Sequence, residues 1–181
     1  MTMTIRLMHG DLLKQDDVDA IVNTVNCVGV MGKGIALQFR NKWPANNQAY
    51  EQACKAGQVK LGTIFVFDSG GLVKPNFIIN FPTKGHWRAK SEIRWIQDGL
   101  KDLITQVQRL KIQSIAIPPL GCGNGGLDWD DVRPLLVEAF AALPEVEARL
   151  FEPAGALAFR AEAESRRRQL TLYPCSFLPE S

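Results

Sequence analysis

The chain has 181 residues, of which 46% are hydrophobic and 22% are charged, and its formal net charge is +2. This composition is typical of one globular domain and excludes a wholly disordered chain, a collagen and a coiled coil. No apolar run reaches the roughly 18 residues of a membrane span. The near balance of 21 basic and 19 acidic residues excludes a protein that coats nucleic acid through bulk charge.

Short apolar segments alternate along the chain with longer segments of helical periodicity. The short segments are bounded by Gly, Pro, Asn or Asp, as strands are. We expect strands at residues 5–8, 20–23, 63–67, 77–80, 114–117 and 148–151. We expect helices at residues 34–42 and 46–56, a long helix capped by Ser91 and running to Leu110, and a last helix from Asp128 or Asp130 through Leu143.

This alternation predicts an α/β domain with three layers and a mixed, mostly parallel central sheet. The core domain is expected to span residues 1–153, with residues 154–181 forming a surface helix and a tail. The four cysteines include no Cys-x-x-Cys pair. Their spacing argues against a zinc site or a disulfide framework and favours a reducing cytoplasm. We expect a monomer without a metal or a cofactor.

Ligands of such sheets bind beyond the carboxyl ends of the strands, and four segments are expected there. Asp11 follows the first strand, where its carboxylate is suited either to an exocyclic amine such as that of adenine or to a turn. A glycine-rich segment, residues 23–36, runs from a strand through a loop into a helix. Its main-chain amides suit an anion, and Asn26 is placed to contact either a hydroxyl-rich ligand or its own loop.

The third and fourth segments follow the strands at 77–80 and 114–117. Lys84 and His86 stand two residues apart in an expected loop. A desolvated lysine loses pKa and can act as a nucleophile, and histidine is a common acid or base, although both residues are also ordinary surface side chains. Residues 118–129 run from the strand at 114–117 through a second glycine loop into a helix. Two such loops suit a ligand with two phosphates.

In this order, the segments resemble a macrodomain, the ADP-ribose-binding fold, over roughly residues 4–153. Residues 30–39 and 119–123 are similar to terminal ADP-ribose glycohydrolases, and residues 80–88 are more similar still to DarG antitoxins. DarG enzymes remove the ADP-ribose that a DarT toxin places on thymidine in single-stranded DNA. Relatives that act on proteins carry Asp in the second loop, where this chain has Gly125.

The resemblance implies catalytic roles for Lys84, His86 and Asn26. Lys84 would either attack the anomeric carbon covalently, with a Schiff base as intermediate, or act there through its charge alone, while His86 orients or protonates and Asn26 positions the ribose. The resemblance also implies ADP-ribose contacts at Asp11, Leu12, Asn26, Met31, Gly32, Lys33, Gly34, Ile35, Ala36, Thr83, Leu120, Gly121, Cys122, Gly123, Asn124 and Gly125.

The expected partners are ADP-ribosylated single-stranded DNA and a DarT-type toxin. DNA contacts are expected from Trp87, Arg88, Lys90 and Arg94, since an aromatic ring beside basic groups suits a single strand, although Trp87 could equally pack under its loop. Two alternatives remain: a module that reads ADP-ribose without cleaving it, and a hydrolase of ADP-ribosylated protein or of small ADP-ribose esters.

Overall fold

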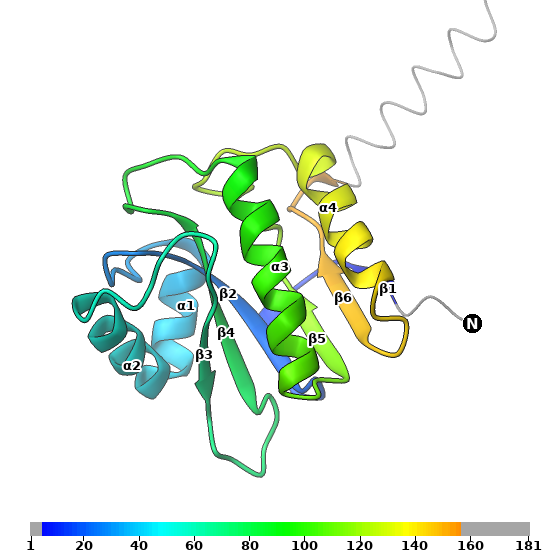
Figure 1. Cartoon of the computed structure of the whole chain (residues 1–181), viewed down its shortest axis with the longest axis horizontal. Helices are drawn as coiled ribbons and strands as arrows, with labels where there is room; N and C mark the ends of the chain where they lie inside the picture. The colour runs from blue at the N-terminus through cyan, green and yellow to red at the C-terminus, as the bar shows by residue number, and fades with distance from the viewer. Residues whose placement is uncertain (1–4, 157–181) are drawn as a thin grey trace, which may run out of the picture.

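The computed structural model of the chain describes residues 5–156. It contains one six-stranded sheet in the order β1-β6-β5-β2-β4-β3, in which only β3 runs antiparallel to its neighbour (Figure 1). The strands are β1 (Ile5–Met8), β2 (Ala20–Asn26), β3 (Phe65–Asp68), β4 (Phe77–Lys84), β5 (Ser114–Ile117) and β6 (Glu147–Phe151). The helices are α1 (Gly34–Lys42), α2 (Pro44–Lys55), α3 (Ile93–Arg109) and α4 (Trp129–Ala141), with a 3-10 turn, η1 (Leu12–Lys14).

The sheet lies between two helical layers, which confirms the predicted three-layer α/β fold. α3 and α4 lie in front of the sheet in Figure 1 and share the largest apolar cluster with it. α1 and α2 cover the opposite face through two smaller clusters. Adjacent residues of one strand serve opposite layers, because side chains of a strand alternate between its faces: Ile78 packs with α1, whereas Ile79 packs with α3 and α4.

A buried polar cluster attaches α2 to the centre of the sheet. Asn80 of β4 exchanges hydrogen bonds with Asn46 of α2 at 2.8 and 3.3 Å, and Asn23 of β2 donates to Asn80 Oδ1 at 3.1 Å. All three side chains are fully buried. Because a buried amide without partners is costly, these bonds favour one placement of α2 over its alternatives.

The two central strands extend further toward their carboxyl ends than expected. β2 continues to Asn26 and β4 to Lys84. Thr83 and Lys84 therefore belong to β4, where Lys84 pairs with Asn26, and the expectation of a loop at Lys84 is wrong. Parallel pairing with the neighbouring strand satisfies the backbone groups of residues that, read alone, resemble a loop.

Most helix boundaries agree with expectation within a few residues, and the cap of α4 is confirmed, since the Asp128 carboxylate accepts from the Asp130 amide at 2.9 Å. The expected cap of α3 is wrong: Glu92 occupies the cap position without a side-chain bond, and Ser91 is buried under a glycine loop. The predicted helix and tail at 154–181 lie outside the described residues from residue 157 onward.

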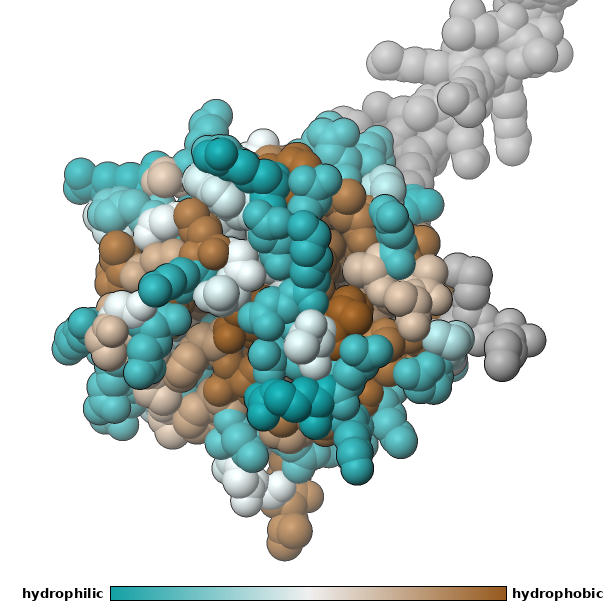
Figure 2. Space-filling model, viewed as in Figure 1, coloured by the Kyte–Doolittle hydropathy of each residue, from teal (hydrophilic) through white to brown (hydrophobic). Residues whose placement is uncertain are grey.

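Hydrophilic side chains run along the outward face of α3 (Figure 2). Within residues 5–156, no helix combines the length and the apolarity that a membrane crossing requires.

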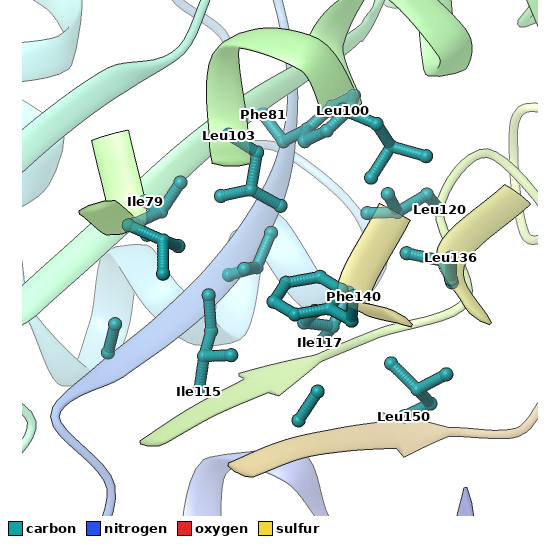
Figure 3. Packing of buried hydrophobic residues seen from close by; sticks show 14 of the residues in the cluster. Ile79, Phe81, Leu100, Leu103, Ile115, Ile117, Leu120, Leu136, Phe140 and Leu150 are labelled. Carbon is teal, nitrogen blue, oxygen red and sulfur yellow. The ribbon is translucent and has the colours of Figure 1, made fainter. Parts of the chain in front are cut away.

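A glycine allows α3 to lie close to β4, the strand that carries Lys84. A Cβ at Gly99 would stand 2.4 Å from the ring of Phe81, a fully buried residue that lies beside Leu100 and Leu103 (Figure 3). Helices elsewhere favour alanine over glycine by about 1 kcal/mol. Here the steric conflict outweighs that preference.

We predict that Gly99→Ala lowers the free energy of unfolding by about 1–2 kcal/mol, since overpacking a core costs more than the helix gains. Chemical denaturation with the unaltered chain as reference measures this change. The double variant with Phe81→Leu should lose less than the sum of the single losses. An increase in the stability of Gly99→Ala alone would contradict the packing argument.

Candidate active site

A cleft of about 930 Å³ opens at the carboxyl ends of β2, β4 and β5. Two glycine-containing loops form its walls: loop 1, residues 27–33, connects β2 to α1, and loop 2, residues 118–128, connects β5 to α4. The lining residues are Thr24, Val25, Asn26, Val30, Gly32, Lys33, Gly34, Ile35, Ala36, Thr83, Lys84, Trp87, Arg88, Pro118, Pro119, Gly121, Cys122, Gly123, Asn124, Gly125, Pro153 and Ala154.

Strand register brings Asn26 and Lys84 together at the base of this cleft. The two residues are partners in the β2–β4 pairing, directly after an irregularity at Val25 that shifts the register. The pairing continues past both strands, since the Cys27 amide donates to the Gly85 carbonyl at 3.1 Å. Two residues 58 positions apart in the sequence therefore occupy neighbouring places at the base of the cleft.

Asn26 organises loop 1. Its Oδ1 accepts from the amides of Val28 and Val30 at 3.0 and 3.3 Å, and its Nδ2 donates to the Val30 carbonyl at 2.7 Å. Tyr50 of α2 donates its hydroxyl to the Asn26 carbonyl at 2.6 Å and to Oδ1 at 3.1 Å. Of the two roles considered for Asn26, the structure shows the bonds to its own loop, with a side chain that also lines the cleft.

The Lys84 amine reaches across the cleft to loop 2. Its Nζ donates to the Asn124 carbonyl at 3.3 Å, and burial lowers the pKa of Lys84. Among the described residues, the lining side chains include three bases, Lys33, Lys84 and Arg88, and no carboxylate. The cleft is thus suited to an anionic ligand, and it holds an amine whose neutral form is more accessible than that of a solvated lysine.

The start of α1 faces the same space. Gly34, its first residue, has a φ of +57°, and a Cβ there would stand 3.1 Å from Asn124 Nδ2. Lys33 occupies the cap position, but its side chain makes no hydrogen bond to the first amides of α1. Amides at a helix start together with loop amides form an anion site, which supports the anion role predicted for the segment of residues 23–36.

Loop 2 is closely packed on Ser91, two residues before the start of α3. A Cβ at Gly125 would lie 2.3 Å from the Ser91 hydroxyl and 2.4 Å from the Gly121 carbonyl oxygen. Ser91 also donates its amide to the Gly125 carbonyl at 2.9 Å. Loop 2 in this conformation therefore accepts only glycine at position 125. Burial is the main cause that raises the pKa of the Cys122 thiol to about 12.

Five predicted site residues do not line the cleft. Leu12, Met31 and Leu120 are core side chains, each less than 5% exposed. Asp11 is exposed and caps η1 by accepting from the Leu13 amide at 2.9 Å, as the turn interpretation predicts. His86 is exposed, and its Nδ1 accepts from the Arg88 amide at 3.2 Å.

Several lining residues were absent from the predicted set. They are Thr24, Val25, Val30, Pro118, Pro119, Pro153 and Ala154. Pro118 and Pro119 lead directly into the predicted glycine loop, and Thr24 and Val25 lie between the two flanking asparagines, so proximity to those motifs was an available signal. Pro153 and Ala154 follow the last strand and carry no motif. These two residues reach the carboxyl edge of the sheet only because β6 pairs with β5.

Comparisons with known proteins agree with this architecture. The Macro domain family profile matches residues 22–136. A Mycobacterium tuberculosis protein named DNA ADP-ribosyl glycohydrolase is 58% identical over 146 residues, which cover 81% of this chain and 41% of that protein. The solved macrodomain of M. tuberculosis DarG is 57% identical with a TM-score of 0.81, covering 83% of this chain and 98% of that one.

A second relative comes from Thermosipho africanus. It is named a DNA ADP-ribosyl transferase-DNA ADP-ribosyl glycohydrolase fusion protein and is 30% identical over 168 residues, covering 84% of this chain and 43% of its own length. The structure of T. africanus DarTG in complex with ADP-ribose has a TM-score of 0.74 and 31% identity, covering 82% of this chain and 42% of that one.

The chain spans 41% of the length of the first curated relatives that it matches. The family match, the high identity and the shared fold nevertheless cover most of the described residues. The chain therefore belongs to the macrodomain family, as a macrodomain of the DarG type.

Proposed function

We propose that this chain is an ADP-ribosyl glycohydrolase that removes ADP-ribose from thymidine in single-stranded DNA, and that it acts as the antitoxin to a DarT-type DNA ADP-ribosyltransferase. Relatives named DNA ADP-ribosyl glycohydrolase, at 53–58% identity, support this activity. The T. africanus fusion protein supports the pairing with a transferase. We further propose that the protein acts as a monomer in the cytoplasm and requires no metal or cofactor.

The observation that carries the proposal is the position of the Lys84 amine. Lys84 is the strand partner of Asn26, and its amine bonds to loop 2 in a cleft whose described lining has no carboxylate. A module that only reads ADP-ribose has no need of a partly desolvated amine at this place. Main-chain amides of both loops would hold the diphosphate, and Lys33 would add positive charge beside it.

In the proposed reaction, the neutral Lys84 amine attacks the anomeric carbon of the distal ribose. The bond from that carbon to thymine N3 breaks, and N3 keeps the electron pair and takes a proton from the lysine nitrogen. The bond from the anomeric carbon to the ring oxygen then breaks, the ring oxygen takes the second proton of that nitrogen, and a Schiff base forms. Water adds to the same carbon, its proton passes to the nitrogen, and the carbon–nitrogen bond breaks, which releases ADP-ribose and restores the amine. Asn26 holds loop 1 against the sugar. The predicted contact of Asp11 with adenine and the predicted acid or orienting role of His86 stay predictions.

The packing of loop 2 disfavours the alternative of a hydrolase acting on ADP-ribosylated protein. The resemblance places an Asp of such relatives at the position of Gly125. A side chain there would overlap Ser91 and the Gly121 carbonyl. The present loop conformation therefore excludes that carboxylate and leaves the cleft chemistry to Lys84.

We predict that Lys84→Ala lowers turnover of ADP-ribosylated single-stranded DNA by at least about 100-fold, since the loss of a nucleophile costs no less than the loss of a proton-transfer group, while ADP-ribose binding is largely retained. Release of free ADP-ribose and calorimetric titration measure the two properties. Lys84→Arg keeps the positive charge without a usable nucleophile, so it should be equally inactive.

Borohydride trapping separates the covalent role from the electrostatic one. Reduction during turnover should leave an adduct on the Lys84 peptide, detectable by mass. Near-normal turnover by Lys84→Ala would refute the catalytic role, and activity of Lys84→Arg without any adduct would assign Lys84 an electrostatic role instead.

The pH dependence provides a second test. Attack requires the neutral amine, so turnover should increase with pH and level off above the pKa of Lys84. Since burial lowers that pKa from its ordinary value of 10.5, the plateau should begin below pH 10.5. A pH–rate profile at saturating substrate measures it. A rate that falls as the amine deprotonates would indicate that Lys84 acts through its charge.

We predict that Gly125→Ala displaces loop 2 and weakens ADP-ribose binding by about tenfold, equivalent to about 1.4 kcal/mol, because the added Cβ would overlap two neighbours. Its melting temperature should also decrease. Gly123→Ala is the matched control for melting temperature, since its Cβ would meet nothing within 4 Å. Unchanged affinity and stability in Gly125→Ala would show that the loop adapts freely.

A further inference from the structure

The segment between β4 and α3 carries three stacked side chains at the edge of the cleft. The rings of His86 and Trp87 lie 5.2 Å apart with an interplanar angle of 29°. The Arg88 guanidinium lies 4.4 Å from the centre of the Trp87 ring. Trp87 and Arg88 both line the cleft. Lys84, which precedes Trp87 by three residues, lines it as well.

Trp87 differs from tryptophans that stabilise the fold. Trp129 is 7% exposed and donates its indole N–H to Glu152 at 3.2 Å. Trp43 packs into an apolar cluster, with its ring 5.0 Å from that of Phe39. Trp87 retains 41% of its surface exposed, so the alternative that it packs under its loop is wrong. Folding therefore does not account for a large apolar ring at this position.

Loop 1 presents further apolar surface at the same opening. Val30, which is 41% exposed, lines the cleft together with Trp87, and Val28 is 47% exposed two residues earlier. An aromatic ring with an apolar neighbour suits the flat face of a nucleobase, because base–aromatic stacking requires no particular hydrogen-bonding pattern.

The basic side chains near this surface differ in whether they are already paired with a carboxylate. Arg88 and Lys90 are exposed, and neither has an ion pair with a described carboxylate. Arg94, predicted to contact DNA as well, pairs with Glu92 at 2.7 Å and lies 5.6 Å from the ring of Trp95. The groups free to meet a phosphate thus lie in the segment that carries Trp87.

We infer that Trp87 and Arg88 form a subsite for the nucleotide adjacent to the modified thymidine. Trp87 stacks on the neighbouring base, and Arg88 moves from the ring to the adjacent phosphate. The ligand class is a single nucleic acid strand. This inference rests on the proposed function in naming DNA as the strand and thymidine as the modified nucleotide. The subsite explains how a cleft suited to ADP-ribose distinguishes an ADP-ribosylated DNA strand from ADP-ribosyl thymidine alone.

Binding of unmodified single-stranded DNA tests the subsite independently of turnover. Titration of the whole chain at low salt with a short oligothymidylate should quench tryptophan fluorescence. Trp87→Ala should weaken DNA binding, followed by anisotropy of a labelled strand, by about tenfold, within the range of one base–aromatic stack. Trp87→Phe should largely restore it. Affinity for ADP-ribose, measured in parallel, should change little.

Salt dependence tests the contribution of Arg88. Each phosphate contact to a single strand contributes about 0.7 to the slope of log affinity against log salt concentration. Arg88→Ala should reduce the slope by about that amount. Lys101→Ala, which removes an exposed base in the middle of α3 that does not line the cleft, should leave the slope unchanged.

Turnover provides the matching comparison. Trp87→Ala should lower kcat/KM for an ADP-ribosylated oligonucleotide by about tenfold and leave that for ADP-ribosyl thymidine nearly unchanged. Equal losses on both substrates, DNA affinity unchanged in Trp87→Ala, or no DNA binding by the unaltered chain would each overturn the subsite. If the unaltered chain releases no ADP-ribose, the proposed function fails, while the binding titrations still decide on Trp87 and Arg88.

Discussion

The pairing of Asn26 with Lys84 at the ends of two parallel strands sets the geometry of the whole cleft. Parallel strands bring their carboxyl ends to one edge, where loop amides and helix starts face the same space. Through this pairing, the residue that organises loop 1 stands beside the residue whose amine reaches loop 2. One backbone register thus connects both walls of the cleft, and a shift by one residue would turn Lys84 to the opposite face of the sheet.

The interior maintains this register by two different means. On one face, bonded asparagines connect β2, β4 and α2. On the other, Gly99 lets α3 approach Phe81 closely enough to bury it fully. Loops 1 and 2, which form the walls above these contacts, are rich in glycine. Their backbone can therefore approach a ligand without side chains in between. A rigid base and closely approaching loops are what a positioned amine requires.

Reasoning from the sequence located the loops correctly but was less accurate for single side chains. Both glycine loops line the cleft, as does Lys84. Leu12 and Leu120 were included because they flank loop motifs, yet their side chains pack into the core. Side chains at successive positions near a strand end point to opposite sides, and a motif does not specify which side faces the ligand. Asp11 shows the same limit, because its carboxylate caps a 3-10 turn.

The sequence by itself determined the layer architecture, the family and the segments that meet at the sheet edge, because hydrophobic periodicity and glycine placement are local properties of the chain. Only the tertiary structure decided that Lys84 belongs to a strand, that Asn26 bonds its own loop and that Trp87 remains uncovered at the opening. Each of these outcomes depends on contacts between segments distant in the sequence. Burial, register and hydrogen-bond partners arise from those contacts and are not properties of any one segment.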